Sequence, residues 1–201
     1  MGLRETKAEK TRNRILREAL RLFKRDGYDR TTIEAIAEAA EIGPRTLYRY
    51  FASKDLILLD PISGNRDFSA TFSRHAVNLS VEEALAEAIL EWARWQDTNA
   101  EEILLVRSLI DQAPIARAKL WDILYQQERA LSTRLAEKLH LPADDLRVVL
   151  SARHVLLTII GTAAEQWRAS AGRSSSIAIA KQVMRMFEEH KVLLPRKAPR
   201  R

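Results

Sequence analysis

Apolar residues recur along almost the whole chain at the spacing of an α-helix, and we find no convincing stretch that alternates between apolar and polar residues as a half-buried strand does. The first helical segment has apolar residues at i, i+4, i+7 and i+8: Ile15, Ala19, Leu22 and Phe23. Gly27 follows as a stop signal. The pattern predicts a first helix over residues 7–26 and an all-α fold.

Three shorter helices are predicted next. Either Thr31 or Thr32 caps the second helix. Pro44 suits the first turn of the third helix, where its missing N–H has no partner, and Gly43 is then the N-cap. The fourth helix begins after Ser53. A short helix, a tight turn and a second short helix opening at Pro44 form the pattern of a helix-turn-helix.

The later part of the chain predicts longer helices. A capping box at Ser80–Glu83 opens one of them. The others are predicted over residues 100–112, 114–139, 143–170 and 175–191.

The helix over residues 143–170 is apolar nearly all round, so it must be covered on two sides. A second subunit is the most economical second cover in a chain of 201 residues, although a central helix of a monomeric bundle has the same pattern. The expected dimer interface combines one face of this helix with the last helix: Val148, Ala152, Val155, Ile159, Ala163, Ile179, Val183 and Met186.

Charge divides the chain into three predicted regions. The formal net charge is +6, and the excess of lysine and arginine lies in residues 1–55 and in the tail 196–201, whereas residues 56–195 are slightly acidic. We predict a domain at 1–55 that binds a polyanion such as DNA, a larger helical domain with another task at 56–195, and a disordered basic tail at 196–201.

Composition excludes several classes of chemistry. There is no cysteine, so disulfides, thiolate nucleophiles and cysteine-ligated metals are absent, as is common in a reducing compartment. The four histidines lack metal-ligand spacing, and no catalytic triad, P-loop or dinucleotide-binding motif is present. We therefore expect no enzyme activity, no cofactor and no metal. We also expect no signal peptide and no membrane span, and hence a cytoplasmic location.

The third predicted helix carries the chemistry expected of a DNA-reading element. Its apolar positions at i, i+3 and i+4 must face the core: Leu47, Tyr50 and Phe51. Arg45 and Arg49 then point outward, where arginine can bond a guanine edge bidentately. The predicted contacts with double-stranded DNA are Thr31, Thr32, Arg45, Thr46, Tyr48, Arg49 and Lys54.

The segment 11–58, with "ILREALRLF", "GYDRTTIEAIAEAA" and "PRTLYRYFASK" in that order, resembles the DNA-binding domain of the TetR family of bacterial transcriptional regulators. The resemblance implies a homodimeric repressor that releases DNA when its C-terminal domain binds a small ligand. Two positions depart from the family pattern. Glu41 replaces a glycine of the turn, which predicts an altered turn or a modest stability cost, and Gly43 replaces a serine or threonine cap.

An apolar or aromatic effector would need a pocket, and the tryptophans of the C-terminal region are candidates to line it. Aromatic residues at helical spacing are more often core filling. The candidate pocket residues are Trp92, Trp95, Arg107, Trp121, Tyr125, His154 and Trp167. Arg107, Arg153 and His154 are polar residues within apolar helices, so each needs a partner: an effector carboxylate or phosphate, an internal salt bridge, or a group at the dimer interface.

Two alternatives to a repressor remain at this point. The same fold could serve an activator or an accessory DNA-binding protein without an effector. A helical ligand-binding or enzymatic bundle with an incidental basic head would need a convergent polar site, which the sequence does not show.

Overall fold

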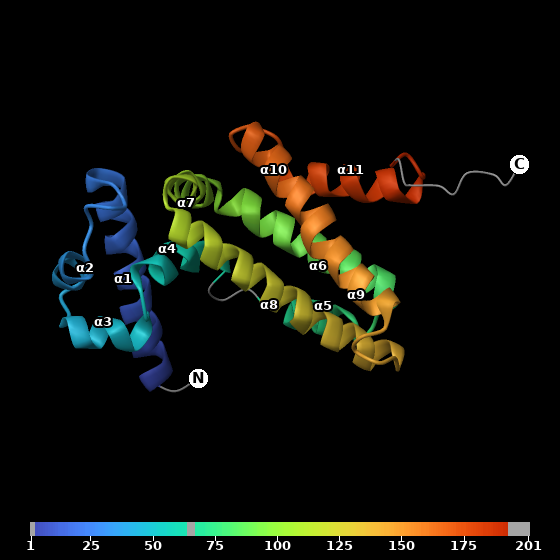
Figure 1. Ribbon diagram of the computed structural model, residues 1–201, viewed down its shortest axis with the longest axis horizontal. Coiled ribbons are helices and arrows are strands. Elements are labelled where there is room, and N and C mark those ends of the chain that lie inside the picture. Colours follow the sequence, from blue (N-terminus) through green and yellow to red (C-terminus); the bar gives the residue numbers. More distant parts are fainter. Residues whose placement is uncertain (1–2, 64–66, 193–201) are drawn as a thin grey trace, which may run out of the picture. The chain divides into compact units, whose positions relative to one another are not determined.

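The computed structural model describes residues 3–63 and 67–192, and every regular element within these ranges is a helix (Figure 1). The all-α prediction is therefore confirmed, while the tail at 196–201 lies outside the described residues. The helices are α1 (Leu3–Asp26), α2 (Ile33–Ala39), α3 (Pro44–Tyr50), α4 (Lys54–Ser63), α5 (Phe68–His75), α6 (Val81–Thr98), α7 (Ala100–Gln112), α8 (Pro114–Leu139), α9 (Leu146–Arg153), η1 (His154–Ile160), α10 (Gly161–Ala169) and α11 (Ser176–Glu188).

The chain forms two compact units that do not follow the division predicted at residue 55. Unit 1 comprises Met1–Asp67 and Asn99–Gln127, and unit 2 comprises Phe68–Thr98 and Glu128–Arg201. Unit 1 therefore includes α4, α7 and the first part of α8 in addition to the predicted DNA-binding helices. The reason is that α4 and α7 pack against α1 and share its core.

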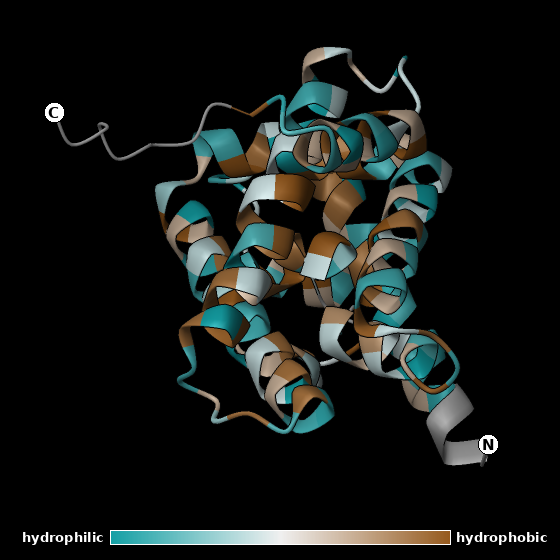
Figure 2. Ribbon diagram, turned by 90° about the vertical axis from the view of Figure 1, so that its right-hand side faces the viewer, coloured by the Kyte–Doolittle hydropathy of each residue, from teal (hydrophilic) through white to brown (hydrophobic). Residues whose placement is uncertain are grey.

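The core of unit 1 is built from the apolar stripes that the sequence predicts. Ile15 and Phe23 of α1, Ile36 of α2, Leu47 of α3 and Leu58 of α4 are all buried in one cluster. In Figure 2 the helical ribbons alternate between hydrophobic and hydrophilic bands, as amphipathic helices do. Burial of these stripes fixes the orientation of α3 on α1 and α2.

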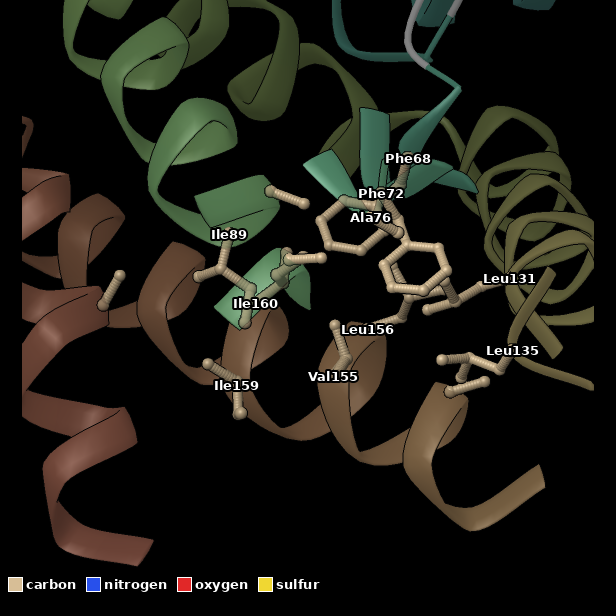
Figure 3. Close-up of a cluster of buried hydrophobic side chains, with 14 of the residues drawn as sticks. Phe68, Phe72, Ala76, Ile89, Leu131, Leu135, Val155, Leu156, Ile159 and Ile160 are labelled. Atoms are coloured by element: carbon tan, nitrogen blue, oxygen red, sulfur yellow. The ribbon is translucent and has the colours of Figure 1, made fainter. Parts of the chain in front are cut away.

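The core of unit 2 brings together side chains from helices that are distant in sequence (Figure 3). Phe72 of α5 and Ile89 of α6 lie with Leu131 and Leu135 of α8, and η1 contributes Val155. α11 packs against α6 and α10. Unit 2 is thus a helical bundle with its own hydrophobic core.

The predicted helix over residues 143–170 contains a π-helical segment, η1, between α9 and α10. In a π-helix the backbone hydrogen bonds join residues i and i+5, and the helix is wider than an α-helix. Residues that α-helical spacing places on two different faces can therefore both reach the core. Ile159 and Ile160 are both buried, although α-helical spacing sets them about 100° apart, on two different faces. The sequence pattern gave no sign of this change in helical period.

The predicted dimer face is wrong for most of its residues. Six of the eight are buried within the core of unit 2 of the same chain and are unavailable to a partner: Val148, Ala152, Val155, Ile159, Ala163 and Val183. Ile179 is half-buried and Met186 is exposed. The exposed apolar residues of α9 and η1 belong to the other face: Leu146, Leu150 and Leu157.

Residues Leu146–Ala169 are also long and apolar enough, by length and composition, to pass as a candidate membrane span. The sequence predicts no membrane span. Core helices of soluble proteins pass the same test, and the inward face of this one is filled by the core of unit 2. Packing therefore explains the apolar residues of the inward face, whereas Leu146, Leu150 and Leu157 are exposed.

Candidate nucleic-acid interface

The second helix of the helix-turn-helix, α3, begins as the sequence predicts. Gly43 is the N-cap with φ −70° and ψ 149°, Pro44 occupies the first turn, and no side chain caps the helix. Leu47 and Phe51 are buried beneath α3, which orients the opposite face toward solvent.

The outward face of α3 is cationic and rich in hydrogen-bonding groups. Arg45 and Arg49 are exposed, and Tyr48 is 51% exposed. Thr46 is half-buried beside them. The Arg49 guanidinium lies 5.6 Å from the centroid of the Tyr50 ring, a cation–π contact that orients the side chain. This face has the size and chemistry of an element that enters the major groove of DNA.

The turn between α2 and α3 retains the geometry of a glycine-containing turn although it carries Glu41. Glu41 has φ 51°, in the left-handed region. Its N–H donates to the Glu38 carbonyl at 2.9 Å, and the Ile42 N–H donates to the Ala37 carbonyl at 3.0 Å. These two bonds form a Schellman motif, which normally has glycine at the left-handed position. The turn is unaltered, so the departure at Glu41 leads to backbone strain.

The two threonines before α2 have different environments. Thr32 is exposed, and its hydroxyl accepts the Ala35 N–H at 3.1 Å, which caps α2. Thr31 is 2% exposed and donates its hydroxyl to the Gly27 carbonyl at 2.8 Å. The prediction that Thr31 contacts DNA through its side chain therefore fails, because the hydroxyl is buried and already bonded.

Lys54 has a structural role that the sequence did not reveal. Its ammonium donates to the carbonyls of Tyr28 at 2.8 Å, Thr31 at 3.0 Å and, more weakly, Asp29 at 3.4 Å. The same ammonium lies 4.2 Å from the centroid of the Tyr28 ring. A lysine has three N–H donors, so these contacts use all of them. Lys54 thus secures the loop between α1 and α2, and the structure gives no support for its prediction as a phosphate contact.

Asp55 links α4 to two other elements of unit 1. Its carboxylate accepts the Tyr28 hydroxyl and the Lys119 ammonium, the latter at 2.5 Å. Burial alone would raise the pKa of Asp55, but the bonds from Lys119 and Tyr28 outweigh it and hold the pKa below its ordinary value. Burial and the same carboxylate raise the pKa of Tyr28. The start of α4, directly after α3, is therefore held to α8.

The candidate effector residues are divided between the two units. Arg107, Trp121 and Tyr125 belong to unit 1, where Trp121 is 61% exposed and Tyr125 is also exposed. The other four belong to unit 2: Trp92, Trp95, His154 and Trp167. The seven candidates therefore do not all belong to one unit.

Among the candidates in unit 2, Trp92 and Trp95 are half-buried and Trp167 is buried. The Trp167 indole nitrogen is shielded and has no hydrogen-bond partner within the described residues. The His154 ring meets the Phe187 ring edge to face at 4.2 Å, and burial lowers the pKa of His154. Burial therefore favours the neutral form of this ring.

Arg153 has an internal partner, one of the three alternatives that the sequence left open. Its guanidinium donates to Glu128 at 2.8 and 3.1 Å, and the Glu128 side chain is 6% exposed. The residues described contain no group of three histidine, aspartate or glutamate side chains able to hold a metal ion.

Comparison with known proteins places the similarity in the helix-turn-helix. Residues 15–60 match the family model of bacterial regulatory proteins, tetR family. The HTH-type transcriptional regulator TcmR of Streptomyces glaucescens is 55% identical over 62 residues, which is 31% of this chain and 27% of TcmR. The matched segment thus spans about a quarter of the length of that relative.

Solved structures resemble the chain over most of its length. FadR from Bacillus subtilis, in complex with stearoyl-CoA, has a TM-score of 0.60 at 20% identity and covers 86% of this chain and 95% of its own. NalD, the secondary repressor of the MexAB-OprM efflux pump in Pseudomonas aeruginosa, has a TM-score of 0.61 at 18% identity, with coverage of 91% and 96%. At such identities the likeness establishes the fold.

Proposed function

Because the chain belongs to the TetR family of bacterial regulators, we propose that it is a homodimeric, cytoplasmic transcriptional repressor that a small-molecule effector releases from a palindromic operator. The observation that carries the proposal is the outward face of α3, where Arg45, Tyr48 and Arg49 are exposed on a helix whose other face is buried.

Each part of this face has a defined task on DNA. Arg45 and Arg49 lie one helical turn apart, so both reach the base edges of the major groove, where each forms a bidentate bond to guanine. The hydroxyl of Tyr48 and the exposed cap Thr32 bond phosphates beside the groove. Thr31 and Lys54 support this surface from within the unit and make no direct contact through their side chains.

Dimerisation places two copies of α3 on one duplex. In a two-fold dimer the recognition helices enter successive major grooves, about 34–36 Å apart. The exposed leucines of α9 and η1, at positions 146, 150 and 157, favour this arrangement because a self-complementary apolar face is covered when two subunits meet. Met186 of α11 is also exposed.

The effector site belongs to unit 2. Trp92, Trp95 and the buried Trp167 supply apolar walls, and the Trp167 indole N–H is a donor that still lacks an acceptor among the described residues. A protein of the same fold was solved with stearoyl-CoA, which supports a fold able to accommodate such a ligand. Effector binding lowers the affinity of the protein for its operator. Operator binding lowers the affinity for the effector by the same factor, because the two binding equilibria are linked.

The arginines of α3 provide the test. The wild-type protein is used to select its best site from random duplex DNA, and the selection is repeated with Arg45→Ala and Arg49→Ala. Each variant is expected to lose base preference at one position of the half-site and about 1–3 kcal/mol of binding free energy.

Arg25→Ala is the matched control, because Arg25 is an exposed arginine of the same unit at the end of α1, bonded to Asp26. The control is expected to select the wild-type site. If all three variants selected that site with unchanged affinity, α3 would not be the reading helix.

A further inference from the structure

Helix α1, which precedes the helix-turn-helix, carries a stripe of basic residues. These residues are not among the DNA contacts proposed above. Six cationic side chains recur along α1 at i, i+3, i+7, i+10, i+14 and i+17: Lys7, Lys10, Arg14, Arg17, Arg21 and Lys24. This spacing keeps them along one side of the helix. Ile15, Ala19 and Leu22 mark the opposite, buried side.

The two halves of the stripe differ in how their charges are used. Arg21 bonds Glu18 at 2.8 Å, and Lys24 lies 3.9 Å from the exposed Glu101. Lys7 and Lys10 are exposed and form no ion pair with the residues that the structure describes. Arg14 and Arg17 also have acidic neighbours, Glu41 at 3.6 Å and Glu18 at 3.3 Å, so the unpaired charges of the stripe are those of Lys7 and Lys10 at its N-terminal end.

That half also borders a concave surface. A hollow of about 430 Å³ is lined by Lys7, Lys10, Thr11, Asn13, Arg14 and Arg17, and we call it the α1 basic groove. The Arg14 Nε is shielded and has no hydrogen-bond partner in the described part of the chain. The donors that a ligand can reach are the exposed ammonium groups of Lys7 and Lys10, and together with Arg14 and Arg17 they favour an anionic ligand that supplies oxygen acceptors.

The α1 basic groove lies next to the helix-turn-helix. Arg14 reaches to 3.6 Å from the carboxylate of Glu41, in the turn before α3. The neighbouring Arg12 guanidinium lies 4.9 Å from the centroid of the Phe51 ring, at the end of α3. Figure 1 shows α3 beside the N-terminal half of α1. The α1 basic groove therefore lies at the flank of the helix-turn-helix.

We propose that the α1 basic groove binds the phosphate backbone of DNA beside the major groove that α3 enters, without reading sequence. Lys7 and Arg14 are about 10 Å apart along the helix axis at 1.5 Å per residue. Duplex DNA carries a charge about every 1.7 Å of its axis, so several phosphates fall within that span. The inference rests on the proposed function, because α3 must hold the duplex for α1 to meet its flank.

The experiment compares two double variants that remove the same charge from the same helix. Lys7→Gln/Lys10→Gln alters the groove, and Arg21→Gln/Lys24→Gln alters the far end of the stripe. Each full-length protein is titrated from about 50 to 200 mM salt with the selected operator and with an unrelated duplex of equal length. Thermal unfolding by circular dichroism establishes that both variants are folded, since all four side chains lie at the surface.

The slope of log K against log salt is expected to become less steep by about 0.9 for each lost phosphate contact, and hence by about 2 per bound subunit for Lys7→Gln/Lys10→Gln. The same loss is expected on both duplexes, with the Arg21→Gln/Lys24→Gln slope close to wild type. Equal slopes for the wild type and Lys7→Gln/Lys10→Gln, or equal losses in both variants, would overturn the proposal.

Failure of the proposed function has a different signature. A wild-type protein that bound the operator and the unrelated duplex equally well would contradict operator recognition by α3. The change in slope on the unrelated duplex would still decide whether the α1 basic groove contacts phosphate.

Discussion

The outward faces of α3 in unit 1 and of α9 with η1 in unit 2 present opposite kinds of side chain to solvent. α3 exposes Arg45, Tyr48 and Arg49, whereas Leu146 is 74% exposed and Leu150 is 60% exposed on α9. Cationic side chains are well solvated in water, so the outward face of α3 is stable when no partner is bound. Exposed leucines leave apolar surface in contact with water, and association with a second subunit would bury that surface.

The two regions also differ in what related proteins share. Sequence identity to TcmR is concentrated in 62 residues of the helix-turn-helix region, while the whole chain resembles FadR from Bacillus subtilis at only 20% identity. On the proposed function, contacts with DNA would constrain particular residue types on α3. A helical core accepts many apolar combinations of similar volume, so the fold persists where the sequence has changed.

The largest predicted effect separates the two faces of α9. Val148→Asp buries an unpaired carboxylate at a fully buried position and is expected to lower the free energy of unfolding by about 4 kcal/mol or more. Leu150→Asp is expected to leave each subunit folded and to weaken the dimer. Urea denaturation and light scattering measure the two effects. A folded Val148→Asp monomer beside an unfolded Leu150→Asp protein would mean that the buried and exposed faces are reversed.

Lys54→Met removes the donor that the carbonyls of Tyr28 and Thr31 share, together with a cation–π contact. The expected loss of unfolding free energy is about 1–3 kcal/mol. The salt slope of DNA binding should not change, because the Lys54 ammonium is already bonded within the protein. Lys24→Met, at an exposed position, should alter stability by no more than about 0.5 kcal/mol. If Lys54→Met made the dependence of DNA binding on salt less steep, Lys54 would contact phosphate, as the sequence predicted.

Asp55→Asn tests the link between α4 and α8 through its pH dependence. The folded-state pKa of Asp55 lies below its ordinary value, so its carboxylate stabilises the fold above pH about 4 and this contribution is lost as the pH falls through the lowered pKa. The variant is expected to be less stable than wild type by about 1 kcal/mol near neutral pH, with the difference shrinking in acid. Denaturant midpoints between pH 2.5 and 7 measure it. A difference that did not vary with pH would exclude ionisation of Asp55 as its cause.

The smallest predicted effects concern the turn before α3. Glu41→Gly relieves a left-handed residue and is expected to raise stability by about 0.5–1 kcal/mol, since the gain is partly offset by the larger freedom of glycine in the unfolded chain. Gly43→Ser should add a few tenths of a kcal/mol as a side-chain cap, because a Cβ at Gly43 meets nothing within 4 Å. Thermal unfolding compares both variants with wild type. Destabilisation by Glu41→Gly would mean that the Glu41 side chain supports the turn.

Where a helix has one apolar face, the sequence was sufficient to predict its role. The orientation of α3 followed from Leu47 and Phe51, and the capping box was confirmed by reciprocal bonds between Ser80 and Glu83 at 3.2 and 3.0 Å. The strain at Glu41 also followed from the expected turn type. In each case local geometry decides the outcome.

Long-range contacts decided what the sequence could not predict. Lys54 was assigned to phosphate because nothing in its neighbourhood along the chain reveals the carbonyls of Tyr28 and Thr31. The partners of Asp55 include Lys119, which is distant in sequence. The faces of α9 and η1 were exchanged because the helix is apolar all round and its period changes at His154. The basic stripe of α1, by contrast, was readable from its spacing and was overlooked.

Selection from random duplex DNA with the wild-type protein tests the central claim most directly, because it requires both a reading helix and a two-fold dimer. The account predicts a palindromic consensus whose half-site centres are about one helical turn of DNA apart, bound by two subunits, with a steep dependence on salt. Weak binding without any enriched sequence would contradict it, and a single enriched half-site bound by one subunit would contradict the dimer.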